Sequence, residues 1–182
     1  MKHKIICIDA GHGGHDSGAV HGKLVEKSLN LTVALALGKA LMTAGWNVIY
    51  TRKADVFIEI NDRVKIAQKA KATLFVSIHH NAGGGVGGEF IYEHETPESE
   101  RLATEVMKAF KAVGQKAHGV GAYSKEDSKG DNYFGVLRNG SIIGGIGEYA
   151  FIDSNADGAK LTPVGLEKEV EAYFNALQAF NK

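Results

Sequence analysis

The chain is poor in cysteine and proline and has no excess of either charge. Its 182 residues include one cysteine, Cys7, and two prolines, so an intrachain disulfide is excluded. The 21 basic residues equal the 21 acidic ones, and a formal net charge of zero gives no overall field that would draw the chain to nucleic acid or to an anionic membrane. We therefore expect no nucleic-acid partner.

Long apolar runs are also absent. No stretch approaches the roughly 18 consecutive apolar residues of a transmembrane helix, so we expect no membrane insertion. A secretory signal needs an apolar segment of about 7 to 15 residues after a basic start, but Lys2 and Lys4 lead into only four apolar residues before Asp9. We expect no signal peptide, synthesis in the cytoplasm, and release by lysis or by another route.

The remaining composition is that of a folded protein. Hydrophobic residues make up 44% of the chain and charged residues 23%, which is ordinary for a globular protein. At this length, folding buries roughly 70% of the unfolded surface, and no linker, internal repeat or low-complexity segment interrupts the chain. We expect a single domain over residues 1–182 and a monomer.

Apolar segments of strand length alternate with amphipathic segments of helix length. The run Ile5–Ile8 predicts a buried strand, and apolar residues at intervals of four from Leu29 to Leu41 predict a helix that ends at Gly45. Further strands are predicted at 46–51, 74–78, 88–94, 134–137 and 142–149, further helices at about 61–71, 99–113 and 163–180, and a surface loop over 115–131. The order predicts a three-layer αβα fold, in which a mixed, mostly parallel twisted sheet of about six strands has helices on both faces.

Residues that can bind a metal or transfer a proton follow the predicted strands, where open α/β sheets collect functional groups. His12 follows the first strand, the pair His79 and His80 follows the strand 74–78, and Glu148 lies in the last strand, while Glu26 begins the first helix. Two histidines and a carboxylate form a typical catalytic zinc set. Neighbouring strand side chains point to opposite faces, so only one of the adjacent histidines is expected at the site, and the alternation leaves open which one.

Both carboxylates also have a purely structural interpretation. An acidic residue in the first turn of a helix, such as Glu26, is favoured by the helix dipole alone. Glu148 lies in an apolar segment, where an unpaired carboxylate is costly. A metal, a raised pKa or a salt bridge, for instance with Arg138, would compensate for that cost. The glycines after the first strand do not form a dinucleotide fingerprint, because Asp16 stands where that motif needs glycine.

Taken together, the motifs resemble the zinc-dependent N-acetylmuramoyl-L-alanine amidases of the Amidase_3 type, found among bacterial autolysins and phage endolysins. The resemblance spans nearly the whole chain and implies a catalytic domain. The matching residues are Asp9-Ala10-Gly11-His12-Gly13-Gly14 with Asp16 and Gly18, Glu26, Thr51-Arg52 with Asp55, Arg63 and Ala67, Val76-Ser77-Ile78-His79-His80-Asn81-Ala82, and Val136-Leu137-Arg138 with Glu148, Phe151 and Ser154-Asn155. Within the family's Ser-Ile-His-x-Asn-Ala motif, the histidine corresponds to His79 and not to His80.

The resemblance implies that zinc is bound by His12, Glu26 and His79 and that Glu148 is the catalytic base. The implied reaction hydrolyses the amide between the lactyl group of N-acetylmuramic acid and L-alanine in peptidoglycan, which lyses the cell wall. Further residues are expected to orient the catalytic groups or contact substrate, namely Arg138 and Asn81. Two alternatives stay open: a zinc carboxypeptidase or other peptidase acting on wall peptides with the same residues, and a non-catalytic wall-binding module.

Overall fold

A computed structural model describes residues 5–140 and 142–182, so Lys2 and Lys4 lie outside the described residues. The main sheet consists of β1 (Ile5–Ala10), β4 (Asn47–Tyr50), β5 (Leu74–Asn81), β6 (Gly88–Tyr92), β7 (Ala117–Tyr123) and β8 (Ile143–Phe151). The helices are α1 (Glu26–Thr43), α2 (Ile60–Lys69), α3 (Pro97–Ala112) and α4 (Pro163–Phe180). A small hairpin, β2 (Val20–His21) and β3 (Leu24–Val25), and two short 3-10 helices, η1 (Gly135–Leu137) and η2 (Gly158–Leu161), complete the described elements.

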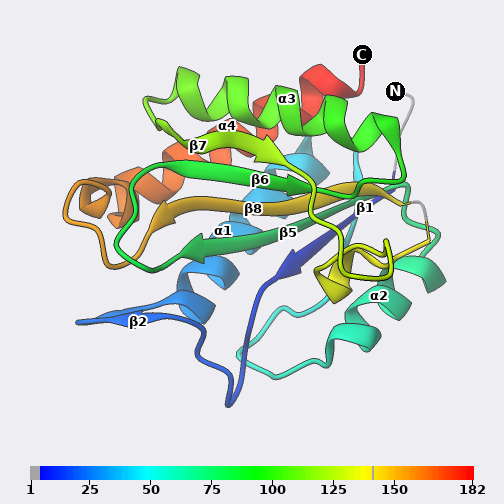
Figure 1. Ribbon diagram of the computed structural model, residues 1–182, viewed down its shortest axis with the longest axis horizontal. Helices are drawn as coiled ribbons and strands as arrows, with labels where there is room; N and C mark the ends of the chain where they lie inside the picture. The colour runs from blue at the N-terminus through cyan, green and yellow to red at the C-terminus, as the bar shows by residue number, and fades with distance from the viewer. Residues whose placement is uncertain (1–4, 141) are drawn as a thin grey trace.

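The sheet is mixed and mostly parallel, as predicted. Its strand order is β4-β1-β5-β8-β6-β7. The first four strands in that order run parallel to one another, and β6 pairs with β8 in the antiparallel sense and with β7 in the parallel sense. Strands β5 and β8 therefore end at the same edge of the sheet, where both arrowheads point to the left in Figure 1.

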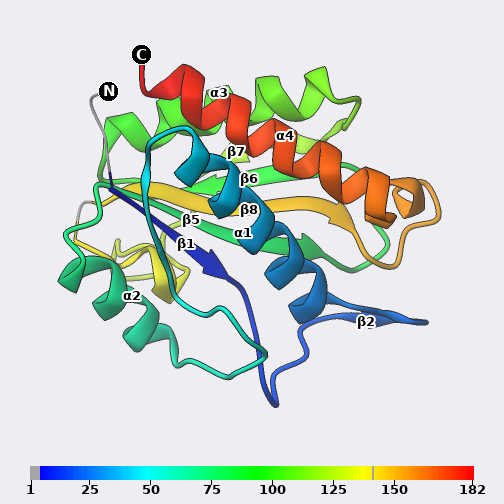
Figure 2. The same ribbon diagram turned by 180° about the vertical axis from the view of Figure 1, so that it is seen from behind.

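Helices cover both faces of the sheet, so the predicted three-layer architecture is confirmed. Helices α1, α3 and α4 pack on one face, and α2 lies on the other together with η1 (Figures 1 and 2). Alternate strand residues divide between two cores. Ile8 and Ile78 face the three-helix side, whereas Cys7 and Phe75 face the α2 side. Cys7 is fully buried, as its position in the first apolar run predicts.

Two predicted segments differ in the structure. The prediction of a surface loop over 115–131 is wrong for the first half of that segment, where β7 forms an edge strand of the sheet. The strand is exposed and contains Gly119 and Gly121 at positive φ, so it shows no apolar alternation. The strand predicted over 134–137 is instead η1, whose Val136 and Leu137 pack into the α2-side core. An apolar run this short does not distinguish a strand from a helical turn.

The remaining elements lie close to their predicted positions. Strand β1 extends to Ala10, two residues past the apolar run, and α1 ends where Gly45 adopts a φ of 86°. The hairpin of β2 and β3 was not predicted, and it projects from the edge at which β5 and β8 end (Figure 1). Across the described ranges, every helix is too short or too polar to cross a bilayer.

Candidate active site

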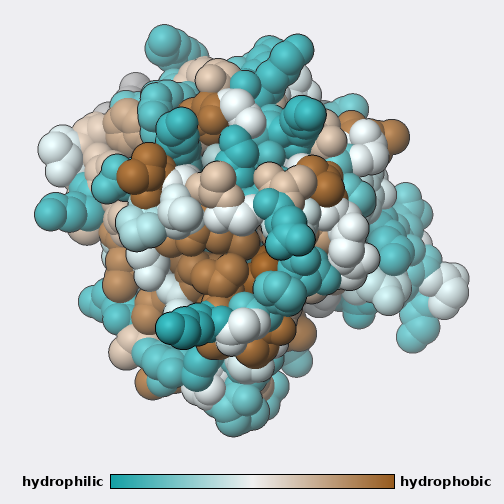
Figure 3. All heavy atoms as spheres, turned by 90° about the vertical axis from the view of Figure 1, so that its left-hand side faces the viewer, coloured by the Kyte–Doolittle hydropathy of each residue, from teal (hydrophilic) through white to brown (hydrophobic). Residues whose placement is uncertain are grey.

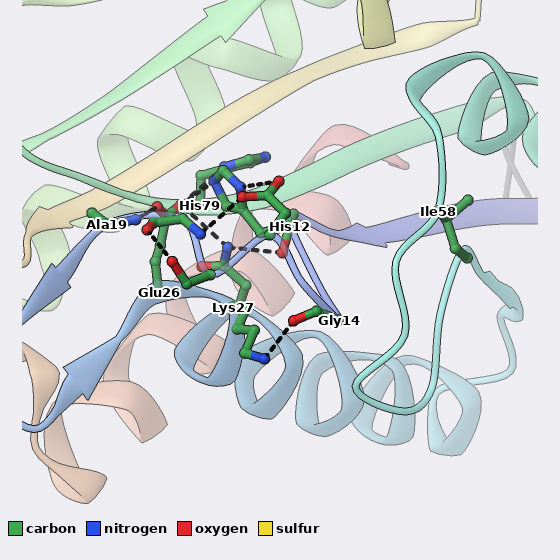
Figure 4. Close-up of polar contacts among 12 residues, drawn as sticks. His12, Gly14, Ala19, Glu26, Lys27, Ile58 and His79 are labelled. Carbon is green, nitrogen blue, oxygen red and sulfur yellow. Dashed lines mark hydrogen bonds and ion pairs between the residues drawn. The ribbon is translucent and has the colours of Figure 1, made fainter.

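The side chains of His12, Glu26 and His79 meet at the edge of the sheet where β5 and β8 end. Oε1 of Glu26 lies 3.1 Å from Nε2 of His12 and 3.0 Å from Nδ1 of His79. One ligand atom from each residue lies within 4.8 Å of the other two, and Figure 4 shows the three side chains pointing toward one another. Two imidazole nitrogens and a carboxylate oxygen are donors that zinc prefers. The three residues therefore fit a metal ion by both chemistry and spacing.

The second polar atom of His12 and of Glu26, the one not directed at the cluster, has a protein partner. These contacts fix the direction of the atom that faces the cluster. Nδ1 of His12 contacts Oδ2 of Asp16 at 2.8 Å, and Oε2 of Glu26 accepts a hydrogen bond from the backbone N–H of Ala19 at 2.8 Å. Metal-binding histidines commonly contact a carboxylate through the second ring nitrogen in this way. Nε2 of His12 and Oε1 of Glu26 are left to face the centre of the cluster.

The charges of the cluster reinforce this arrangement. Burial alone would lower the pKa of His12, but the carboxylates of Glu26 and Asp16 raise it to about 9. Burial alone would raise the pKa of Glu26, but hydrogen bonds from His12 and His79 hold it well below its usual range. Without a metal, a buried carboxylate is thus stabilised by imidazole protons. A divalent cation would take the place of these protons, which is how metal binding is coupled to proton release.

Two glycines let the backbone approach the cluster. A Cβ atom on Gly11 would collide with the imidazole ring of His79. Gly18 has a φ of +62°, and a Cβ atom there would lie 2.5 Å from Oε2 of Glu26. A side chain at either position would displace a member of the cluster. This is the physical reason for glycine in the loop that follows β1.

The loop that carries His12 is held by two arginines. His12 itself has a φ of 60°, which is uncommon outside glycine. The guanidinium of Arg63 donates to the carbonyl oxygens of His12 and Ala10 at 2.8 and 2.7 Å, and Arg52 donates to the carbonyl of Gly11 at 2.9 Å. Sequence reasoning placed both arginines in a motif but assigned them no role. Their position shows that they fix the strand end from which the imidazole projects.

The Arg63 guanidinium is itself paired with a buried carboxylate. It lies 2.8 Å from Oδ1 of Asp9, which also accepts a hydrogen bond from the hydroxyl of Thr51 at 2.6 Å. The hydroxyl of Ser77 donates to the other Asp9 oxygen, also at 2.6 Å. Burial would raise the pKa of Asp9, but Arg63 and these hydroxyls lower it. The carboxylate therefore stays ionised and keeps the arginine in place.

Glu148 lies beside the cluster on β8. It is in register with His79 on one side and with Glu89 on the other, so the three side chains point to the same face of the sheet. Glu148 is half-buried, and its Oε2 has no hydrogen-bond partner among the described residues. Burial raises its pKa to about 7; His79 lowers it, while Glu26 and Glu89 add to the rise. A carboxylate in this state can take up a proton near neutral pH.

The salt bridge between Arg138 and Glu148, which the sequence left open, is not formed. Arg138 instead contacts Oδ2 of Asp127 at 2.7 Å and donates to the carbonyl of Asn132. A role for Arg138 in orienting Glu148 or contacting substrate stays a prediction. Asn81 donates to Oε1 of Glu89 at 2.9 Å. It therefore lies in the row of polar residues that contains Glu148, and its contact with substrate also stays a prediction.

A cavity of about 340 Å³ adjoins His12 and His79. Arg63 and Asp16 contribute polar groups to it, but most of its walls are apolar. The apolar residues are Phe57, Ile58, Ile60, Phe134, Val136 and Ile146. Figure 3 looks onto the edge where β5 and β8 end and shows apolar side chains gathered in a hollow, with hydrophilic side chains around them. A ligand at the cluster would therefore lie beside a mostly apolar cavity that also exposes the polar groups of Arg63 and Asp16.

The fold and this cluster define the class of protein: an α/β enzyme with a candidate metal centre and a neighbouring carboxylate of raised pKa. Comparison with known families gives the family. The profile for N-acetylmuramoyl-L-alanine amidase matches residues 6–179. The chain belongs to this family and is an enzyme of the amidase class, as the sequence motifs predicted.

Individual relatives agree with the family assignment. A sporulation-specific N-acetylmuramoyl-L-alanine amidase of Bacillus subtilis is 35% identical over 97% of this chain and 68% of the relative. An endolysin of Bacillus phage SPP1 is 35% identical over 87% of this chain and 58% of the endolysin. The solved catalytic domain of CwlV, an N-acetylmuramoyl-L-alanine amidase of Bacillus (Paenibacillus) polymyxa var. colistinus, superposes with a TM-score of 0.84 at 30% identity over 97% of both chains.

Proposed function

We propose that this chain is a zinc-dependent amidase that hydrolyses the amide between the lactyl group of N-acetylmuramic acid and the L-alanine of peptidoglycan. The observation that carries the proposal is the convergence of three side chains: Oε1 of Glu26 lies 3.1 Å from Nε2 of His12 and 3.0 Å from Nδ1 of His79, and one ligand atom of each residue lies within 4.8 Å of the other two. The unpaired Glu148 carboxylate lies one strand away from His79. These four residues supply the ligands and the base that such a reaction needs.

In this proposal His12, Glu26 and His79 bind zinc and Glu148 transfers the proton. Bound zinc lowers the pKa of a water molecule toward 7 and polarises a carbonyl group. Glu148 takes a proton from the water whose oxygen forms the new bond to the amide carbon, and it returns that proton to the nitrogen as the C–N bond breaks. The products are the free lactyl carboxylate and the amino terminus of the stem peptide. A pKa near 7 suits both halves of this proton transfer.

The apolar cavity beside His12 has a place in the same proposal. The lactyl group and L-alanine each carry a methyl group next to the amide, and the walls formed by Phe57, Ile58 and Phe134 would accept such groups. The substrate is an extracellular polymer, so the enzyme acts on the cell wall. We also propose that residues 1–182 form one domain that acts as a monomer.

The role of Glu148 is tested by the Glu148→Ala variant on purified cell walls. General-base catalysis typically contributes about 10² to 10⁴ in rate, so we expect a loss of that size, while zinc content stays at about one ion per chain. Glu167→Ala, which removes an exposed carboxylate from α4, is the matched control and keeps full activity. Wall clearance by the Glu148→Ala variant at the wild-type rate would contradict the assigned role.

Two other functions remain as outcomes of product analysis. A zinc carboxypeptidase or other peptidase would use the same ligands and base, but it would release amino acids or peptides from the stem and expose no amino terminus on L-alanine. A non-catalytic wall-binding module would be retained on sacculi without turnover and without metal. Glu148 favours an enzyme, because a binding module gains nothing from a half-buried carboxylate whose Oε2 has no hydrogen-bond partner among the described residues.

A further inference from the structure

A chain of buried polar side chains runs from Glu26 into the face of the sheet opposite His79. Oε1 of Glu26 accepts a hydrogen bond from Nδ2 of Asn30 at 3.3 Å. Oδ1 of Asn30 lies 2.8 Å from Nδ1 of His80. Nε2 of His80 lies 3.1 Å from Oε2 of Glu169. The chain links α1, β5 and α4, three elements that are distant in sequence.

These residues lie deep in the protein. Asn30 and Glu169 have no exposed surface, and His80 is 1% exposed. Because His80 follows His79 on the same strand, its side chain points to the three-helix face and cannot join the metal cluster. A buried ionisable pair is costly, and well-packed apolar residues in its place are often at least as stable. The stability of the fold therefore does not by itself account for the pair.

The hydrogen-bond directions in this chain are determined by the Asn30 amide. Its Nδ2 group donates to the carbonyl oxygen of Gly11 at 3.2 Å as well as to Glu26. Oδ1 therefore accepts, and Nδ1 of His80 must donate to it. Nε2 of His80 then shares a proton with Glu169, which keeps the imidazole in that orientation. Each residue in the chain thus fixes the direction of the next.

The last acceptor of the chain is an atom of the proposed metal site. Oε1 of Glu26 is the oxygen that faces both Nε2 of His12 and Nδ1 of His79. It also lies 3.3 Å from the backbone N–H of His80. The side-chain amide of Asn30 and the backbone N–H of His80 therefore both donate to this oxygen, in addition to the two imidazoles.

We propose that Glu169, His80 and Asn30 are positioning residues that aim Oε1 of Glu26 at the metal. This inference rests on the proposed function, because it takes Glu26 as a metal ligand. The residues touch neither the metal nor the substrate. Their effect is to restrict the Glu26 carboxylate to one orientation before the metal binds. Sequence reasoning set His80 aside once His79 was chosen, and it gave Glu169 no role.

The test compares Glu169→Leu with Glu169→Gln. Leucine removes the partner of Nε2, whereas the glutamine amide can donate to Nε2 and leave Nδ1 donating to Asn30. Zinc affinity is measured by competition with a chromophoric chelator, and the visible spectrum of the cobalt-loaded protein reports ligand geometry. Partners outside the ligand shell contribute about 10- to 100-fold to affinity. We expect Glu169→Leu to bind zinc at least about tenfold more weakly with an altered cobalt spectrum, and Glu169→Gln to restore both.

Tyr173→Phe is the matched control. It removes a buried polar group from the same helix, a hydroxyl that has no hydrogen-bond partner in the described structure, and it should leave zinc affinity unchanged. A purely structural pair would lower the urea midpoint of Glu169→Leu while zinc affinity and the cobalt spectrum stay at wild-type values. That result would overturn the inference.

A measurement on the wild-type protein covers the case in which Glu169→Leu does not fold. Nitrogen-15 NMR of the imidazoles should show His80 protonated on Nδ1, with a slowly exchanging proton, and an unprotonated Nδ1 would overturn the inference. Failure of the proposed function has a different signature. If Glu26→Ala binds zinc as tightly as the wild type, Glu26 is not a ligand. If Glu26→Ala loses zinc but Glu169→Leu does not, only the positioning role fails.

Discussion

Replacing Glu148 by glutamine should stabilise the metal-free protein, and the gain should grow with pH. Burial raises the pKa of this carboxyl to about 7, against 4.5 for an exposed glutamate. Below pH 4.5 the group is protonated in the folded and unfolded states, so ionisation costs the fold nothing. Between pH 4.5 and about 7 the unfolded chain releases this proton while the folded state still holds it, so stability falls across this range, and the loss is complete above pH 7, where both states are ionised.

The size of the effect follows from the same two values. At about 1.4 kcal/mol per pH unit, complete ionisation would destabilise the folded state by at most about 3.5 kcal/mol. The side chain is half-buried, and solvent reduces the cost, so we expect about 2 kcal/mol between pH 5 and pH 8. Glutamine keeps the shape of the side chain without the charge.

Urea unfolding of the wild type and Glu148→Gln, both stripped of metal, measures this difference. The free energy of unfolding of the variant should exceed that of the wild type by about 2 kcal/mol more at pH 8 than at pH 5. Every other titrating group is common to the two proteins, so the comparison isolates Glu148. An equal difference at the two pH values, or a variant that loses stability at pH 8, would refute a raised pKa at this position.

Two further predictions concern the loop that carries the first proposed ligand. Gly11→Ala places a methyl group against the ring of His79, so zinc affinity should fall at least about tenfold. The control Gly158→Ala adds a methyl group in open space and should leave zinc affinity unchanged. Equal zinc affinities of the two variants would contradict a steric clash between residue 11 and His79. Arg63→Met leaves the Asp9 carboxylate buried without its cation, and urea unfolding should show a loss of about 3 to 5 kcal/mol. Adding Asp9→Asn should recover part of that loss, and additive losses would show that the pair is not coupled.

Much of the architecture and the main cluster follow from local sequence signals. The repeat from Leu29 to Leu41 has a helical period, and the run before Asp9 is rich in β-branched residues and closed by turn residues, which favours a strand. His12 and His79 follow apolar runs of strand length, and the carboxyl ends of neighbouring parallel strands meet at one edge. That one of the adjacent histidines meets His12 was therefore predictable from local signals, whereas the choice of His79 over His80 and the inclusion of Glu26 came from the motif resemblance.

Features that depend on distant partners were not predictable in the same way. Strand β7 is an exposed edge with glycines at positive φ, so neither apolar alternation nor β-branched residues indicate it. The contacts of the two arginines with the His12 loop, and the contact between His80 and Glu169, join residues that are 41 to 89 positions apart. A buried histidine or arginine has no local periodic signature, because its partner is decided by the packing of whole elements. These are the residues to which sequence reasoning assigned no role.

The central proposal is that a metal bound by His12, Glu26 and His79 enables amide hydrolysis in peptidoglycan. The most direct test is digestion of purified peptidoglycan by the wild-type protein, with and without a chelator, followed by mass spectrometry of the fragments. We predict intact glycan strands, stem peptides with a free amino terminus on L-alanine, loss of these products with chelator, and their return when zinc is added. Unchanged digestion in a chelator that strips the protein of metal, or cleavage confined to bonds within the stem peptide, would contradict the proposal.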